Sequence, residues 1–220
     1  MDVLALTDPA GLAWRVLLAY LLGAVPFGFV FCRVLKGVDL RTVGSGNIGA
    51  TNAMRVLGAP LGLFVFGLDV GKGYAPAAFL AGEDPAWQVA CGAAAVAGHV
   101  WPVYLGFRGG KAVATGCGAI LAIEPWVVVI AGGSWLLCLV LFGWVSVASM
   151  AMGLGFPLAA WGLAQPWEVI LGTSGLTLLI LVRHRSNMVK LARGTEGRAN
   201  IWYRLRGRDP RSDPEDVSDE

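Results

Sequence analysis

Long apolar runs alternate with short polar stretches along most of the chain. Five uninterrupted runs cover residues 12–32, 86–107, 126–143, 145–164 and 167–182. Each run is close to the ~20 residues that an α-helix needs to cross a bilayer. Lys, Arg, Asp and Glu are all absent from residues 125–167. The pattern therefore predicts transmembrane helices.

Two further segments are apolar but less regular. Asp69, Lys72, Pro76 and several glycines interrupt residues 56–82, and residues 112–123 are short for a full crossing. Counting both gives an all-α, polytopic transmembrane bundle of about seven crossings. We expect residues 1–203 to form the transmembrane domain and residues 204–220 to form a charged, disordered cytoplasmic tail, because the last twelve residues hold six acids and one arginine.

The basic residues sort by side when seven crossings are assumed. Apart from Lys72 in an apolar segment and Arg15 close to the opposite face, they fall in alternate connections, around Arg33 to Arg55, around Arg108 and Lys111, and from Arg183 to Arg208, whereas the intervening connections have none. Because cytoplasmic loops are enriched in Lys and Arg, this predicts an external N-terminus and a cytoplasmic C-terminus.

Composition agrees with a membrane protein and argues against several kinds of site. The chain is 56% hydrophobic and 15% charged, with a net charge of +2, and a soluble domain of this size carries about a quarter charged residues. Four single cysteines in apolar segments offer no zinc or redox spacing. We expect no metal, no cofactor and no nucleic-acid partner, and the N-terminus lacks the basic stretch of a cleavable signal.

The first polar cluster is GSGNIGATNAMR, residues 44–55. Its glycines Gly44, Gly46 and Gly49 allow turns with positive φ, whose successive N–H groups bind anions. Four side chains add hydrogen-bond donors: Ser45, Asn47, Thr51 and Asn52. Arg55 adds a planar cation that suits phosphate or carboxylate. The cluster is predicted to hold an anion, and a flexible linker is the alternative.

The second polar cluster is GHVWPVYLGFRGGKAVAT, residues 98–115. Gly109 and Gly110 precede a short apolar helix, so their N–H groups are expected to point at an anion beside the positive end of that helix. The cluster also supplies two cations and a hydroxyl: Arg108, Lys111 and Thr115. A phosphate site is the favoured interpretation, and an ordinary basic loop end is the other.

The third polar cluster is RHRSNMVKLARGTEGR, residues 183–198. His184 and Asn187 lie on one face if the last crossing continues as a helix through them. Glu196 is the single acid among five bases: Arg183, Arg185, Lys190, Arg193 and Arg198. It is expected to orient a cation or to form a surface pair, and the bases alone are typical of a patch that contacts lipid headgroups.

Three further polar residues accompany the apolar segments. Asp69 and Lys72 are i,i+3 neighbours and can pair inside the bundle. Ionisable groups at membrane depth are functional candidates, although a structural pair fits equally well. His99 ends an apolar run and is as compatible with a tethering role as with catalysis.

Together the clusters predict a cytoplasmic, phosphate-type anion site assembled from three separated segments. An enzyme of phospholipid chemistry and a transporter of phosphorylated or anionic solutes both fit. The broken crossing at residues 56–82 is typical of carriers, whereas no inverted repeat is evident.

In this order and spacing, the three clusters resemble the signature motifs of the bacterial acyl phosphate:glycerol-3-phosphate acyltransferase family, PlsY. LDVGKG at residues 68–73 resembles a further pattern of that family, and the resemblance covers roughly residues 10–200. It implies acyl transfer from acyl phosphate to the 1-hydroxyl of glycerol-3-phosphate, forming 1-acylglycerol-3-phosphate (lysophosphatidic acid) and inorganic phosphate in phospholipid biosynthesis. It also implies a bacterial inner-membrane protein with a cytoplasmic active site.

The resemblance implies roles for Ser45, Arg55, His184, Asn187 and the loop of Gly109, Gly110 and Lys111, and the polar clusters and apolar segments themselves suggest the remaining residues. Catalytic roles are expected for His184, Asn187 and Ser45. Substrate or phosphate binding is expected for Gly44, Gly46, Asn47, Thr51, Asn52, Arg55, Arg108, Gly109, Gly110, Lys111 and Thr115, with the loop around Lys111 binding glycerol-3-phosphate. Supporting roles are expected for Asp69, Lys72, His99, Arg183 and Glu196.

Direct attack by the substrate hydroxyl is the expected mechanism, because no cysteine lies in a motif. The proton acceptor is His184 or a substrate phosphate, and Ser45 as a nucleophile is a weaker option. The chain also lacks an H-x-x-x-x-D pair, since Tyr104 and Val189 stand five residues after its two histidines. This argues against the acyltransferases that use that pair.

Overall fold

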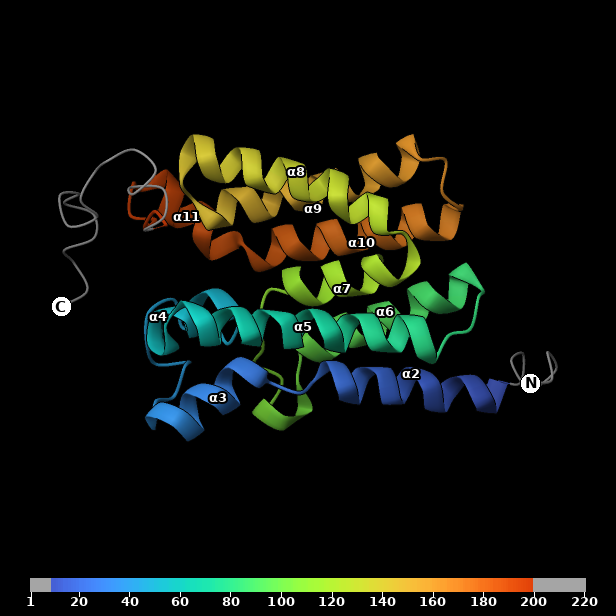
Figure 1. The fold of residues 1–220 in the computed structure, drawn as a ribbon, viewed down its shortest axis with the longest axis horizontal. Helices are drawn as coiled ribbons and strands as arrows, with labels where there is room; N and C mark the ends of the chain where they lie inside the picture. Colours follow the sequence, from blue (N-terminus) through green and yellow to red (C-terminus); the bar gives the residue numbers. More distant parts are fainter. Residues whose placement is uncertain (1–8, 200–220) are drawn as a thin grey trace. The chain divides into compact units, whose positions relative to one another are not determined.

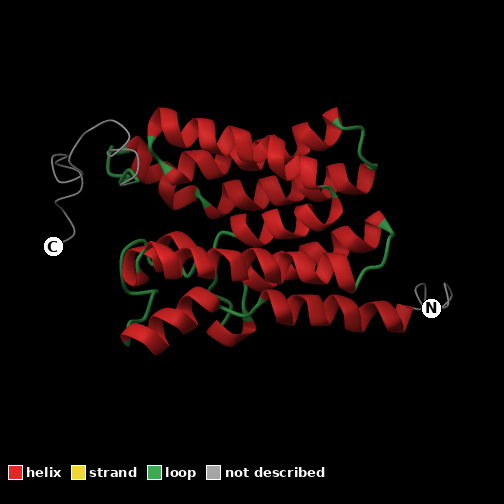
Figure 2. Cartoon of the chain, in the orientation of Figure 1, coloured by secondary structure: helices red, strands yellow, loops and turns green. Residues whose placement is uncertain are grey.

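The computed structural model describes residues 9–199, which form ten α-helices, one short 3₁₀-helix and no strand (Figures 1 and 2). The prediction of an all-α fold is confirmed. The tail predicted at residues 204–220 lies outside the described residues, so its disorder stays a prediction.

The helices follow the apolar runs closely. Their bounds are α2 Pro9–Gly23, α3 Phe27–Lys36, α4 Ala50–Leu57, α5 Ala59–Phe79, α6 Pro85–Val100, η1 Val103–Leu105, α7 Val113–Ile123, α8 Pro125–Phe142, α9 Val145–Gly162, α10 Trp167–Arg183 and α11 Arg185–Ala192. Within the described residues, three stretches are long and apolar enough to span a membrane: Ala13–Lys36, which α2 and α3 share, and helices α8 and α9. The count of seven crossings stays a prediction.

The first apolar run is two helices instead of the one expected over residues 12–32. α2 closes with a hydrogen bond from the Ala24 N–H to the Tyr20 carbonyl, 2.8 Å. Pro26 follows, and its ring removes an N–H and disfavours helical backbone at the residue before it. α3 then runs to Lys36 and ends at Gly37, whose φ of 69° forms a left-handed cap. The break between the two helices, at residues 24–26, therefore lies within an apolar segment.

The described residues separate into two compact units. The first contains residues 9–125 and 166–172, and α5 packs in it against α4, α6 and α7. α5 and α7 approach very closely, because a methyl group at Gly73 would collide with the Thr115 carbonyl and one at Gly118 with the Val70 carbonyl. Small residues at such crossings let helix backbones meet in membrane proteins.

The second unit contains residues 126–165 and 173–199. In it α9 packs on α10, where the Thr177 hydroxyl donates to the Gly153 carbonyl, 2.5 Å, and lies 2.8 Å from the Thr173 carbonyl. α9 also packs on α8, since a methyl group at Gly155 would lie 3.2 Å from the Ala131 Cα. This unit carries the third polar cluster.

Candidate functional site

The first cluster begins with a glycine-rich turn before α4. Gly44 and Gly46 have φ angles of 55° and 66°, so the predicted left-handed turn is confirmed at both positions. Gly49 does not share it: its φ is −77°, because it is the extended cap residue of α4, and its N–H donates to Asn47 Oδ1 at 2.9 Å. The expectation of positive φ at Gly49 is wrong.

Asn52 organises this turn from inside. It is 2% exposed, and its Nδ2 lies 3.1 Å from the Leu40 carbonyl and 3.0 Å from those of Val43 and Asn47. Its Oδ1 accepts from the Ser45 N–H at 3.1 Å. The amide therefore binds the loop, and the expectation that Asn52 donates to a substrate anion is corrected to a structural role.

The outer surface of the first cluster is polar and exposed. Ser45, Thr51 and Arg55 are all exposed. The Arg55 Nη1 lies 3.6 Å from the point that a Cβ would occupy on Gly44, so the guanidinium sits beside the left-handed turn. A hydroxyl, a cation and a tight backbone turn are thus gathered on one exposed face.

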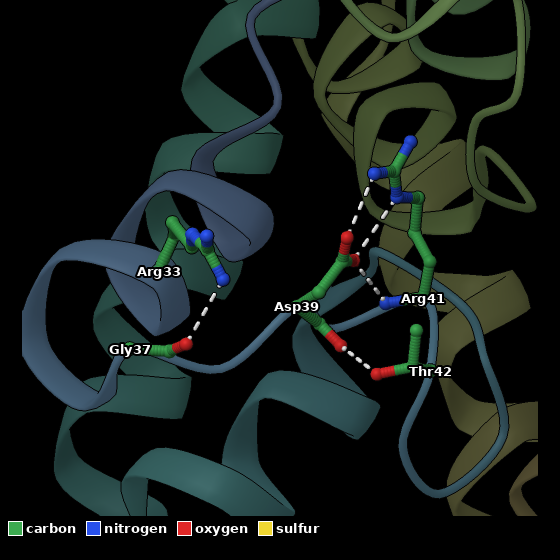
Figure 3. A network of polar contacts seen from close by, with 5 residues as sticks. All are labelled: Arg33, Gly37, Asp39, Arg41 and Thr42. Atoms are coloured by element: carbon green, nitrogen blue, oxygen red, sulfur yellow. Dashed lines mark hydrogen bonds and ion pairs between the residues drawn. The ribbon is translucent and has the colours of Figure 1, made fainter.

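The loop between α3 and the first cluster is held by charge-assisted contacts (Figure 3). Arg41 donates from Nε and Nη2 to the two Asp39 carboxylate oxygens, at 3.0 and 2.7 Å. Thr42 Oγ1 donates to the Asp39 carbonyl at 2.9 Å, and Arg33 Nη1 to the Gly37 carbonyl at 3.0 Å. The hydrogen bonds and charge of Arg41 lower the pKa of Asp39 to about 2. This ion pair, the Asp39–Arg41 clamp, therefore stays ionised at neutral pH.

In the second cluster, Gly109 and Gly110 pack against the end of α6. The Gly109 N–H donates to the Val100 carbonyl at 3.1 Å, and the Gly110 N–H donates to the His99 carbonyl at 3.0 Å. A methyl group on Gly110 would collide with His99 Nε2, and one on Gly109 with the His99 carbonyl. The expectation that these two N–H groups point at an anion is wrong, because the glycines allow a close approach of the loop to α6.

The rest of the second cluster leads into α7. Arg108 is exposed and Lys111 is half-buried, while Ala112 has φ 64° and caps the helix. Thr115, in the first turn, is fully buried, and its hydroxyl has no hydrogen-bond partner among the described residues. Two cations therefore lie just before a helix N-terminus, where the backbone dipole also favours anions.

A buried ion pair accompanies these loops in the first unit. Lys72 Nζ lies 2.7 Å from Asp69 Oδ1, and the predicted pairing of these i,i+3 neighbours is confirmed. His99 Nδ1 lies 3.9 Å from the same oxygen. Lys72 also donates to the Val25 carbonyl at 2.8 Å, in the break between α2 and α3.

In the third cluster, the helix does not continue through His184 as supposed. α10 ends at Arg183, and His184 is the cap residue of α11. The buried imidazole places Nδ1 2.8 Å from the Ile180 carbonyl. Because a carbonyl can only accept, Nδ1 carries the proton, and Nε2 is the acceptor of the neutral ring.

Glu196 orients the third cluster through Asn187. The Asn187 Nδ2 donates to Glu196 Oε1 at 2.6 Å, and the Glu196 carbonyl accepts from Trp144 Nε1 at 2.9 Å. Arg198 lies over the Trp144 ring, 4.8 Å from its centroid. Of the two interpretations of Glu196, the structure favours orientation, but of an amide instead of a cation. The half-buried Arg183 ends α10.

The structure thus brings the first two clusters into one unit and the third cluster into the other. Trp144 is a contact that sequence reasoning missed. It is the cap residue of α9, and nothing at that position of the sequence signals a bond to residue 196. Among residues 9–199, no three His, Cys, Asp or Glu side chains lie close enough together to hold a metal ion.

Comparisons with known proteins agree on one family. A family model described as glycerol-3-phosphate acyltransferase matches residues 13–194. A glycerol-3-phosphate acyltransferase of Dinoroseobacter shibae is 44% identical over 195 residues, which cover 87% of this chain and 95% of the relative. One from Synechococcus sp. (strain CC9902) is 46% identical, with coverages of 82% and 92%.

Two solved structures resemble most of the chain. Both are crystal structures of PlsY (YgiH), described as an integral membrane glycerol 3-phosphate acyltransferase. The glycerol 3-phosphate form has a TM-score of 0.83 and 40% identity, and covers 88% of this chain and 98% of its own. The lysophosphatidic acid form has a TM-score of 0.81 and 37% identity, with the same coverages.

Proposed function

The chain belongs to the glycerol-3-phosphate acyltransferase family, and from this premise we propose that it transfers a fatty acyl group from acyl phosphate to the 1-hydroxyl of glycerol-3-phosphate. The products are 1-acylglycerol-3-phosphate and inorganic phosphate. An acyl phosphate is an activated mixed anhydride, so positioning and charge neutralisation supply much of the rate.

The observation that carries this proposal is that hydrogen bonds fix which atoms of His184 and Asn187 donate and which accept. The Ile180 carbonyl holds the proton of His184 on Nδ1, and the Glu196 carboxylate holds the amide N–H of Asn187. The imidazole Nε2 and the amide Oδ1 are then the acceptor atoms of these side chains. Acceptors suit a hydroxyl and do not suit phosphate oxygens, which are themselves acceptors.

The first two clusters have the complementary chemistry. Arg55, Arg108 and Lys111 supply cations, with Ser45 and Thr51 as neutral donors. Guanidinium and ammonium groups suit phosphate, which both substrates carry. We assign glycerol-3-phosphate binding to the loop around Lys111, and place Ser45 and Arg55 in the site.

The proposed step is a direct displacement. The 1-hydroxyl oxygen bonds to the acyl carbonyl carbon, and the bond from that carbon to the bridging phosphate oxygen breaks. The departing phosphate takes the electron pair and is stabilised by the cations. The hydroxyl proton passes to His184 Nε2 or to a phosphate oxygen of the substrate.

The location that we propose is the bacterial plasma membrane, with the active site facing the cytoplasm. The family relatives compared above are bacterial, and the connections assigned to the outside contain no Lys or Arg, although Arg15 in α2 lies close to that face. A membrane-impermeant thiol reagent on intact cells should label Glu83→Cys and spare Lys36→Cys, since the native cysteines are buried or half-buried. Labelling of Lys36→Cys alone would reverse the orientation.

The reaction is tested with purified protein in detergent. We expect palmitoyl phosphate and glycerol-3-phosphate to give lysophosphatidic acid and phosphate in equal amounts. Acyl-CoA and acyl carrier protein donors, tested in parallel, should give no product. Product from a thioester donor alone would replace the proposed donor, and no product from any donor would turn attention to solute uptake.

A further inference from the structure

We propose that Asp69, Lys72 and His99 are positioning residues that set the loop for glycerol-3-phosphate. The proposal rests on the proposed function, because it assumes that the loop around Lys111 binds this substrate. All three side chains are buried, with exposed fractions of 2%, 7% and 4%.

The buried Asp69–Lys72 pair is linked to the second cluster by His99. The Asp69 carboxylate oxygen Oδ1 lies 3.9 Å from His99 Nδ1. The imidazole packs directly against Gly110, where a side chain of any size would meet Nε2. The backbone of His99 also accepts the Gly110 N–H at 3.0 Å. The ring orientation therefore sets where Gly110, and Lys111 after it, can lie.

The same Asp69–Lys72 pair is linked to the first cluster by the break between α2 and α3. Lys72 Nζ donates to the Val25 carbonyl at 2.8 Å and lies 5.6 Å from the Phe27 ring centroid. The next residue, Gly28, packs against the carbonyl of Ile48 in the first cluster. One buried pair therefore contacts segments that lead into both anion-binding loops of this unit.

Stability alone does not account for such a pair. Removing two charges from water is costly, and well-packed apolar side chains in place of a buried pair are often neutral or stabilising. Ionisable groups at membrane depth usually serve function. Here the contacts with His99 and with the α2–α3 break would serve to position the two loops.

The test compares the kinetics of four variants with wild type. Asp69→Asn removes the charge beside His99, and His99→Gln removes the ring while both charges stay. Asp69→Asn/Lys72→Met removes both charges, so no unpaired ion is left to prevent folding. Val65→Ala, on the same helix and fully buried, is the matched control for destabilisation.

We expect the first three variants to raise KM for glycerol-3-phosphate at least about tenfold, as ångström-scale displacement of a binding group does, while KM for palmitoyl phosphate changes less than about twofold. Val65→Ala should lower the unfolding temperature and leave both KM values unchanged. An unchanged KM for glycerol-3-phosphate in folded His99→Gln overturns the proposal, whatever the other variants do.

Equal rises of KM in the positioning variants and in Val65→Ala would also overturn it, because general destabilisation would then explain the effect. Failure of the proposed function is distinguishable, because wild-type protein would then give no product from any acyl phosphate. Active wild type with kinetically silent variants refutes only the positioning role.

Discussion

Replacing Asn52 with alanine tests the claim that this side chain builds the glycine-rich turn before α4. The amide is 2% exposed, and it joins three loop carbonyls and the Ser45 N–H to α4. Asn52→Ala leaves these backbone groups without their partner. The change should therefore destabilise the fold and not merely weaken substrate binding.

The magnitude follows from the contacts. Nδ2 has two hydrogens to share among three carbonyls, so Asn52 makes the equivalent of three hydrogen bonds, each contributing about 1 kcal/mol. Alanine returns about 0.5 kcal/mol through its higher helix propensity in α4. The net loss is about 2.5 kcal/mol, which corresponds to an unfolding temperature about 5–10 °C lower for a chain of this size.

The assay is thermal unfolding of purified protein in one detergent at fixed concentration. Thr51→Ala is the matched control, since Thr51 is the exposed neighbour in the same helix and should change stability by less than about 0.5 kcal/mol. Asn52→Asp keeps the shape but sets a carboxylate against three carbonyls, so it should be at least as destabilising as alanine. An Asn52→Ala protein as stable as Thr51→Ala would refute the structural role.

Three further predictions concern the third cluster and the Asp39–Arg41 clamp. If His184 is the base, His184→Ala should lower kcat about 100-fold or more and abolish the loss of rate at acid pH, whereas unchanged turnover and pH dependence would leave the proton with the substrate phosphate. Glu196→Ala should lower kcat about as much as Asn187→Ala, because it frees the amide to rotate, and full activity would show that Asn187 needs no orientation. The pKa of Asp39 is lowered in the folded state, so the Asp39–Arg41 clamp contributes stability above the ordinary pKa of 3.8 and loses it only as pH falls toward about 2. The unfolding temperature should therefore respond equally to pH between 7 and 5 in wild type and Asp39→Asn, and a difference within that range would contradict the assignment.

Much of the fold could be predicted because bilayer length and hydropathy act locally along the chain. Each apolar run is mostly helical, although the run over residues 86–107 leaves the α-helix at Val100, and the i,i+3 spacing of Asp69 and Lys72 was enough to predict their pairing. The break at Ala24–Pro26 was missed because the run is apolar throughout, although Pro26 was its local signal. The interruption at His184 has no such marker in the sequence.

The candidate site was predictable in residue type but not in geometry. Glycines and amides are typical of anion sites, yet the Gly110 N–H and the Asn52 amide are bonded to protein carbonyls. Those carbonyls belong to residues 5 to 12 positions away in the chain, and no spacing rule specifies them. The buried positions Ala50, Ala53 and Leu57 mark one packed face of α4 and offer the one local hint that the neighbouring Asn52 points inward.

The close crossing of α5 and α7 has a consequence for surveys of mutational tolerance. At Gly73 and Gly118 even a methyl group would meet backbone of the opposite helix, and backbone cannot rotate aside as a flexible side chain can. A saturation screen for growth should therefore score both positions as intolerant as the polar clusters, although neither carries a group that could touch a substrate. A map of functional residues built from mutational tolerance alone would wrongly extend the active site along the α5–α7 crossing.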